Sequence, residues 1–181
     1  SFRPDKAFAI HDTANFLAYI SRLSAASGIS ISDMDSLLSA MESRIDFFAL
    51  AGCKVADHGL SQLPKNNPFN SALEHELKEF FATNGATPFS DPDAFVFYLL
   101  TSLCKLYHAR EWVQQFHLGA IRNNNARLKL KLGADAGFDS IGDYAQAERL
   151  SALLNSLDAE DKLSKTIIYN LNPADNALFA T

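Results

Sequence analysis

Cysteine and long apolar runs are scarce in this chain. Its 181 residues contain only two cysteines, which lie far apart and form no Cys-x-x-Cys pair. This spacing excludes a disulfide framework and favours a reduced, cytoplasmic setting. The longest apolar run covers residues 95–100 and is far too short to span a bilayer. We therefore expect neither a disulfide-stapled scaffold nor a membrane protein.

Positive charge is also in short supply. Lysine and arginine number 16 against 21 aspartates and glutamates, which gives a net charge of −5 and a pI near 5.5. Binding to a phosphate backbone needs a basic face, and the sequence shows none, so nucleic acids are excluded as partners. No glycine-rich phosphate loop follows a predicted strand, which argues against a nucleotide-binding fold.

Apolar residues, in contrast, make up 48% of the chain, enough for one domain to bury a core. Many recur at spacings of three and four residues after a capping residue, which predicts helices. The predicted helices begin at Asp12 or Thr13, at Ser32, at Ser71, at Ser90 or Asp91, near Ala147 and near Asp175. Residues 127–132 alternate basic and apolar side chains and fit either a strand or a short helix.

Four segments that predict strands each end in polar residues. These ends are Arg3-Pro4, Asp57-His58-Gly59, His117-Leu118-Gly119 and Asn170-Leu171-Asn172-Pro173. Helices fill the interval after each strand, so the strands can be parallel neighbours joined by right-handed crossovers. In α/β enzymes the carboxyl ends of such strands carry the chemistry.

This alternation predicts an α/β fold, and specifically part of a (β/α)8 TIM barrel. About four consecutive βα units with extra helices account for residues 1–181. A closed barrel of eight units typically takes about 250 residues or more. We therefore expect residues 1–181 to be the central to C-terminal part of one barrel domain, without a separate second domain.

Five words of sequence carry a resemblance to a known family: FRPDK at 2–6, DHGL at 57–60, HLGAIRNNN at 117–125, GFDSIGD at 137–143 and KTIIYNLNPADN at 165–176. On these words the chain resembles the uronate isomerases, also called glucuronate isomerases, over its whole length. The resemblance implies an α/β barrel of the amidohydrolase superfamily. It also implies a cytoplasmic intramolecular oxidoreductase of hexuronate catabolism, which interconverts D-glucuronate with D-fructuronate and D-galacturonate with D-tagaturonate.

The resemblance further implies a divalent metal, for which we expect zinc. In the family the metal is held by a His-x-His pair on the first strand and an aspartate on the last. This chain contains no His-x-His pair, and the position of the aspartate falls outside it. We therefore expect no metal ligands within this chain and no activity from the chain alone. The expected ligand is a small hexuronate, and a homo-oligomer is compatible with the resemblance.

Conversion of an aldose to a ketose needs a base, an acid and a group that holds the substrate's carboxylate. Arg3 suits the last role, because a guanidinium binds a carboxylate through two parallel hydrogen bonds. The competing interpretation is a surface arginine beside a turn. Asp57 and His117 are the candidate catalytic residues, although the Asp-His-Gly triplet alone is weak evidence and many histidines are core residues. His58 is expected to brace the turn.

The remaining polar residues near the strand ends leave alternatives open. Arg122, Asn123 and Asn124 are candidate substrate-binding residues, and bracing of their own loop is an equally good interpretation. Asn170 and Asn172 either reach the rim of the site or form a turn with Pro173. Tyr169 is expected in the core.

Two other functions fit the same residues. A free-standing α/β module could bind an acidic sugar without catalysis. A structural α/β domain would neither bind a sugar nor catalyse a reaction. The gene sequence upstream of Ser1 discriminates between the enzyme and the binding module. A His-x-His pair there supports the enzyme, whereas a start codon close to Ser1 supports the binding module.

Overall fold

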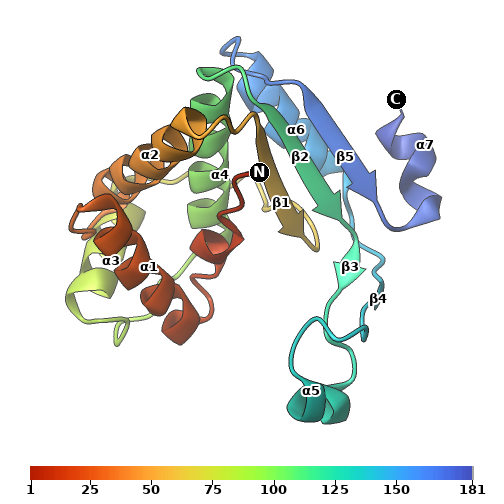
Figure 1. Ribbon diagram of the computed structural model, residues 1–181, viewed down its shortest axis with the longest axis horizontal. Helices are drawn as coiled ribbons and strands as arrows, with labels where there is room; N and C mark the ends of the chain where they lie inside the picture. Colours follow the sequence, from red (N-terminus) through yellow and green to blue (C-terminus); the bar gives the residue numbers. More distant parts are fainter. Residues whose placement is uncertain (181) are drawn as a thin grey trace.

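A parallel sheet lies at the centre of the structure, a computed structural model that describes residues 1–180. Its strands follow one another in the order β1 (Val55–Leu60), β2 (Val113–Leu118) and β5 (Thr166–Asn170). Phe2 extends the sheet beside β1 through a parallel bridge to Ala56. The predicted order of four parallel segments is therefore confirmed, although the first is reduced to this bridge (Figure 1).

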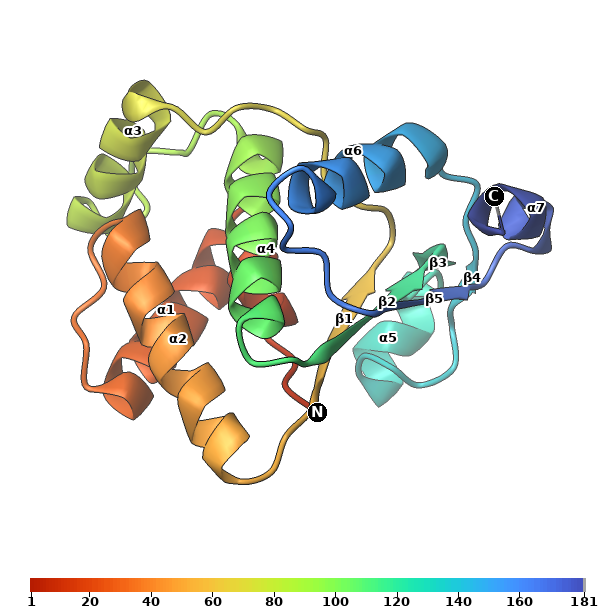
Figure 2. The same ribbon diagram turned by 90° about the horizontal axis from the view of Figure 1, so that it is seen from above.

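Helices α4 and α6 cover one face of the sheet, as Figure 2 shows. The α-helices are α1 (Thr13–Ser27), α2 (Met34–Leu50), α3 (Ser71–Ala82), α4 (Pro92–His108), α5 (Ala126–Leu132), α6 (Ala147–Asp158) and α7 (Asn176–Phe179). Two short 3-10 helices, η1 (Asp5–Phe8) and η2 (Pro173–Asp175), complete the described elements. Within residues 1–180 each helix is too short or too polar to cross a membrane.

The predicted helix starts are correct to within one or two residues. Asp12 caps α1 by accepting from the backbone N–H of Asn15, and Asp91 caps α4 with Pro92 in its first turn. Two predicted caps are wrong by one position. Asp33 caps α2 where Ser32 was expected, and Asn70 caps α3 where Ser71 was expected. In both cases a neighbouring Asp or Asn is an equally good acceptor, so the cap alone could not determine the register.

Side chains along the strands alternate between a buried and an open face of the sheet. In β2, Gln114, Phe116 and Leu118 are buried beneath the helices, whereas Gln115 and His117 are only partly buried. The open face has no helix over it in the part of the chain that the structure describes.

Beyond β2 the chain leaves the sheet and forms a separate small unit. Strands β3 (Ala120–Ile121) and β4 (Ser140–Ile141) pair antiparallel, and α5 lies between them in the sequence. Figure 1 shows this unit projecting below the end of β2. The segment 127–132, left open from the sequence, is helical, and α5 has no buried residue.

The position of two predicted site residues needs correction. Asp57 and His58 lie inside β1 and do not follow it, because the strand continues to Leu60. The pairing of β1 with β2 explains the extension, since residues 55–60 match residues 113–118 one for one. His117, by comparison, is one residue short of the end of its strand.

Candidate active site

Two rows of side chains cross the open face of the sheet. The first row is Asp57, Gln115 and Ile167, and the second is Gly59, His117 and Tyr169, one residue from each strand. Side chains in such rows are direct cross-strand neighbours. Asp57 on β1 and His117 on β2 sit diagonally across the rows, and the histidine Nε2 lies 3.0 Å from the Asp57 Oδ1.

Asp57 is the residue on which these contacts converge. Its Oδ1 accepts from Gln115 Nε2 at 3.2 Å as well as lying beside His117, and its Oδ2 lies 3.2 Å from Arg3 Nη1. The side chain is only 10% exposed. A carboxylate this deeply buried needs charged or hydrogen-bonding partners, and Asp57 has three.

The contact with Asp57 determines which nitrogen of His117 can exchange a proton. The His117 Nε2 is the ring nitrogen that faces the Asp57 carboxylate, so a tautomer that donates to Asp57 carries its hydrogen on Nε2. In the neutral imidazole the Nδ1 is then the unprotonated acceptor. The His117 side chain is 40% exposed, so it remains reachable from the open face.

Arg3 reaches the site from the short bridge at the sheet edge. Its Nε donates to Asp5 Oδ2 at 2.9 Å, and Gly59 lets the guanidinium cross β1, because a Cβ there would come within 2.2 Å of Arg3 Nη2. A guanidinium has five N–H donors, and the two carboxylates beside it take only part of them. The hydrogen bond to Asp5 and both nearby carboxylates raise the pKa of Arg3, so its charge is permanent.

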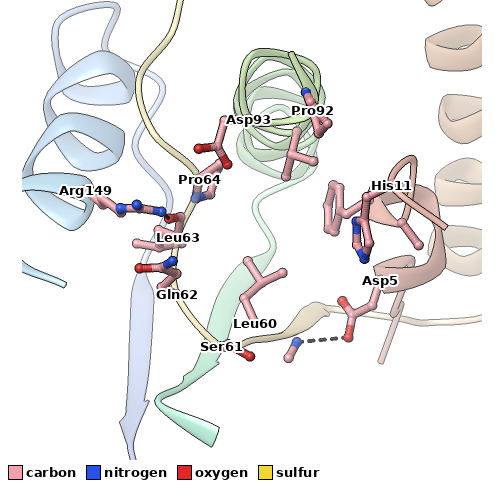
Figure 3. Close-up of a pocket in the computed structure, with 14 residues that line it drawn as sticks. Asp5, His11, Leu60, Ser61, Gln62, Leu63, Pro64, Pro92, Asp93 and Arg149 are labelled. Carbon is pink, nitrogen blue, oxygen red and sulfur yellow. Dashed lines mark hydrogen bonds between the residues drawn. The ribbon is translucent and has the colours of Figure 1, made fainter. Parts of the chain in front are cut away.

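Asp5 fixes the position of Arg3. Its Oδ2 also accepts from the backbone N–H of Gly59 at 2.9 Å, drawn as the dashed line in Figure 3. Burial alone would raise the pKa of this carboxyl, but the nearby His58 ring and the hydrogen bonds from Arg3 and Gly59 hold the pKa below its usual value. Asp5 is therefore ionised at neutral pH and balances the charge of Arg3.

His58 has a different role from the expected one. It does not brace a turn, because its side chain is fully buried on the helix-covered face. Its ring lies 5.4 Å from Phe116 and 5.6 Å from Phe8, and its Nδ1 lies 3.4 Å from Asp5 Oδ1. His58 thus lies close to Asp5 but on the sheet face opposite to Asp57, as the period-two alternation requires.

A hollow of about 600 Å³ adjoins Arg3. Its lining includes three cationic side chains, Arg3, Lys6 and Arg122, and two carboxylates, Asp5 and Asp135. The excess of positive charge suits a small anionic ligand. The volume falls within the usual range for small-molecule sites, which is roughly 300–1,000 Å³.

The polar loop after β2 mostly holds itself together. Arg122 Nη1 lies 2.5 Å from Asp139, and the Asn123 side chain accepts from the backbone N–H of Asp135 at 3.2 Å. The Asn124 amide donates to Ser140, and Asn125 caps α5. Loop bracing therefore accounts for the contacts of all three asparagines, whereas Arg122 also lines the hollow.

Sequence reasoning missed two side chains of the open face. Tyr169 was expected in the core, which is wrong, because it is 46% exposed and its ring stacks on His117 at 4.4 Å. Gln115 was not considered, although it lies two residues before His117 and must share its face. Asn170 and Asn172 form the turn before η2, the second of the two expected alternatives.

A second hollow, of about 320 Å³, shares Asp5 and Gly59 with the first. Figure 3 shows it between η1, the segment after β1 and the start of α4. Neither hollow is lined by Asp57 or His117, but only the first is lined by Arg3, which contacts Asp57. We therefore place the candidate active site on the open face beside Arg3.

The structure does not assemble a metal centre from this chain's own side chains. Across residues 1–180, no group of three or more His, Cys, Asp or Glu side chains comes together in an arrangement that could hold a metal ion. A site with its usual number of protein ligands would need further residues.

Comparison with known proteins gives one consistent family for this chain. The sequence model of the family described as glucuronate isomerase matches residues 1–181. The chain is 47% identical over 184 residues to a uronate isomerase from Flavobacterium johnsoniae and 42% identical over 181 residues to one from Caldanaerobacter subterraneus. It covers 38% of the length of each of these relatives.

Solved structures give the same result for the fold. The crystal structure of uronate isomerase from Thermotoga maritima matches with a TM-score of 0.83 and 26% identity, over 97% of this chain and 38% of that one. Glucuronate isomerase from Caulobacter crescentus matches with a TM-score of 0.79 and 25% identity, over 97% and 36%.

Proposed function

This chain belongs to the glucuronate isomerase family, and from this premise we propose that it forms part of an aldose–ketose isomerase acting on hexuronates. The expected reactions are the conversion of D-glucuronate to D-fructuronate and of D-galacturonate to D-tagaturonate. One observation from the structure carries the proposal. His117, Asp57 and Arg3 meet on one open face of a parallel sheet, near the carboxyl ends of its strands.

The reaction moves a proton between neighbouring carbons without net oxidation. A base removes the proton from the hydroxyl-bearing carbon beside the aldehyde, the electrons of that C–H bond form the new C=C bond, and the aldehyde oxygen takes up a proton to give an enediol. Return of a proton to the former aldehyde carbon, with loss of the proton from the neighbouring hydroxyl, then gives the ketose. In this proposal His117 exchanges the proton through its Nδ1, because its Nε2 is held by Asp57. Asp57 stabilises the required tautomer and holds Arg3 beside it.

Arg3 binds the carboxylate that distinguishes a uronate from a neutral sugar. Its charge is fixed by Asp5 and Asp57, and the adjoining hollow of about 600 Å³ also carries Lys6 and Arg122. Arg122 assists at the far side of the hollow. Asn123 and Asn124 contribute indirectly, because their side chains form hydrogen bonds within the loop and so hold its conformation beside the hollow.

The open face becomes the interior of a barrel in this proposal. Residues 1–181 form the central to C-terminal part of one (β/α)8 domain, with about four of its units. The coverage of 38% of the relatives' length supports this interpretation, as does the uncovered row of side chains at Gln115, His117, Ile167 and Tyr169. The remaining units would cover that face and complete the cavity.

The proposed cofactor and cellular location rest on the family resemblance. A divalent metal, expected to be zinc, would bind through residues outside this chain, because residues 1–180 assemble no complete ligand set. We propose a cytoplasmic enzyme of hexuronate catabolism that could work as a homo-oligomer.

A non-catalytic module that binds an acidic sugar is the alternative. The hollow with three cations would serve that role without proton transfer. The paired His117 and Asp57 favour the enzyme, because simple binding of a carboxylate does not require an imidazole with a free Nδ1.

The proposal is tested by comparing the complete gene product with the 181-residue chain alone. We expect the complete protein to convert D-glucuronate to D-fructuronate, and the chain alone to give no ketose. The open sheet face and its unpaired β5 edge would also make the isolated chain self-associate. Ketose formation is measured by chromatography, and mass by native mass spectrometry. Ketose from the chain alone, or none from the complete protein supplied with zinc, would contradict the proposal.

A glycine-to-alanine change tests the role of Arg3 without altering that residue. A Cβ at Gly59 would come within 2.2 Å of the Arg3 guanidinium, which must move away from Asp57. Because the atom displaced is the end of a flexible side chain, Gly59→Ala should keep the fold. We expect KM for D-glucuronate to rise by up to about tenfold, the equivalent of roughly 1.4 kcal/mol. In an Arg3→Ala background the same change should add little. An unchanged KM in the single variant would show that Arg3 does not need its present position.

A further inference from the structure

The side chains around the candidate active site form a closed ring of contacts that includes two residues without an assigned role. Asp57 contacts His117, His117 stacks on Tyr169, Tyr169 contacts Gln115, and Gln115 returns to Asp57. We propose that Gln115 and Tyr169 are positioning residues that hold His117 and Asp57 in the geometry for proton transfer. The inference rests on the proposed isomerase function and adds two residues to its site.

Strand pairing brings the ring together. Asp57 and Gln115 are cross-strand partners on β1 and β2, and His117 and Tyr169 are cross-strand partners on β2 and β5. The four side chains therefore stand on the paired strands β1, β2 and β5, and no loop contributes to them. A site built on paired strands holds its geometry better than one built on loops.

The side-chain amide of Gln115 carries both a hydrogen-bond donor and an acceptor, which lets it join Asp57 to Tyr169. Its Nε2 donates to Asp57 Oδ1 at 3.2 Å, and its Oε1 accepts from the Tyr169 hydroxyl at 3.4 Å. A glutamate could not donate to Asp57, and an apolar side chain could do neither. The glutamine therefore keeps Asp57 Oδ1 directed toward the imidazole and links it to the tyrosine.

Tyr169 controls the orientation of the imidazole. The two rings lie 4.4 Å apart with only 7° between their planes, so they are in parallel contact. Rotation of the imidazole about its own bond to Cβ would break this stack and carry Nε2 away from Asp57. The Tyr169 side chain contacts His117 and Gln115, so the ring lies against the imidazole as a fixed support.

These contacts predict a loss of rate with little loss of affinity. Gln115→Met and Tyr169→Leu, made in the complete gene product, should each lower kcat by about 10- to 100-fold, because small misplacements of a reacting group have effects of this size. KM for D-glucuronate should stay within about twofold, since Arg3 is unaffected. Tyr169→Phe keeps the ring and should lose only about threefold, because it breaks one weak hydrogen bond.

A kinetic isotope effect separates positioning from a general structural role. With D-glucuronate deuterated at the carbon that loses its proton, the isotope effect on kcat should be larger in Gln115→Met and Tyr169→Leu than in the parent. Misplacement of His117 slows proton transfer relative to the other steps, whereas mild destabilisation of the fold does not. Tyr98→Leu is the matched control, because Tyr98 is also an exposed, stacked tyrosine, 5.0 Å from Phe69 and away from the site.

The same variants can be examined without activity. The ring current of Tyr169 should shift the imidazole C–H resonances of His117, and Tyr169→Leu should move them while Tyr98→Leu does not. If the parent protein has no isomerase activity, the proposed function fails, and these resonances still test the ring. An active parent whose kcat and isotope effect are unchanged in both Gln115→Met and Tyr169→Leu would overturn the inference. If Tyr169→Leu does not fold, the kinetics of Gln115→Met and Tyr169→Phe test the inference instead.

Discussion

Replacing either His117 or Asp57 by alanine in the complete gene product is expected to lower kcat by roughly 10²-fold or more. His117→Ala removes the imidazole that faces Asp57 on the open face of the sheet, and with it the free Nδ1. Asp57→Ala leaves that imidazole free to take the other tautomer and removes one of the two carboxylate partners of Arg3. Steady-state kinetics with D-glucuronate measure the loss, and thermal unfolding shows whether the fold has survived.

The two residues act as a pair, so their effects should not add. The double variant is expected to lose about as much as the more damaging single variant, because either change disables the same proton transfer. Asp158→Asn is the matched control, since Asp158 is an exposed carboxylate at the end of α6. Full activity in His117→Ala would assign proton transfer to another residue, and activity retained in Asp57→Ala as well would exclude both.

The strands and their order could be predicted because the signals are local. Each strand is a short segment between helices with good caps, so a parallel arrangement with helical crossovers is the simplest connection. The convergence of Asp57 and His117 followed from this order, and the structure brings them to 3.0 Å. The end of β1 could not be predicted, because its residues 57–60 read as a turn until β2 pairs with them.

The roles of Tyr169 and His58 could not be predicted because they depend on which sheet face the helices cover. Alternation shows that Tyr169 and Ile168 point to opposite faces, but not which of them is buried. The helices cover the face of His58, Phe116 and Ile168, so a histidine enters the core and a tyrosine is exposed. Which face the helices cover depends on tertiary packing. The local sequence, in which polar and apolar residues alternate, does not show it.

Replacing Arg3 by lysine is expected to raise KM for hexuronates by about ten- to a hundredfold while the fold survives. A charge-assisted, two-pronged hydrogen bond to a carboxylate is worth roughly 1.5–3 kcal/mol, and a lysine keeps the charge but not the fork. A lysine has three N–H donors where the arginine has five, and it must still contact Asp5 and Asp57. Fewer donors therefore remain for the substrate. The effect should appear mainly in KM, because the residue lies at the carboxylate end and takes no part in proton transfer.

The control for this variant is Arg127→Lys, which makes the same change on the exposed surface of α5. A neutral aldose offers a second comparison. Because such a sugar has no carboxylate, any residual conversion of it should respond far less to Arg3→Lys than conversion of D-glucuronate does. Equal losses with both sugars would mean that Arg3 acts by holding Asp57 and not by binding the substrate. An unchanged affinity for D-glucuronate in Arg3→Lys would return Arg3 to the role of a surface residue that balances Asp5 beside a turn.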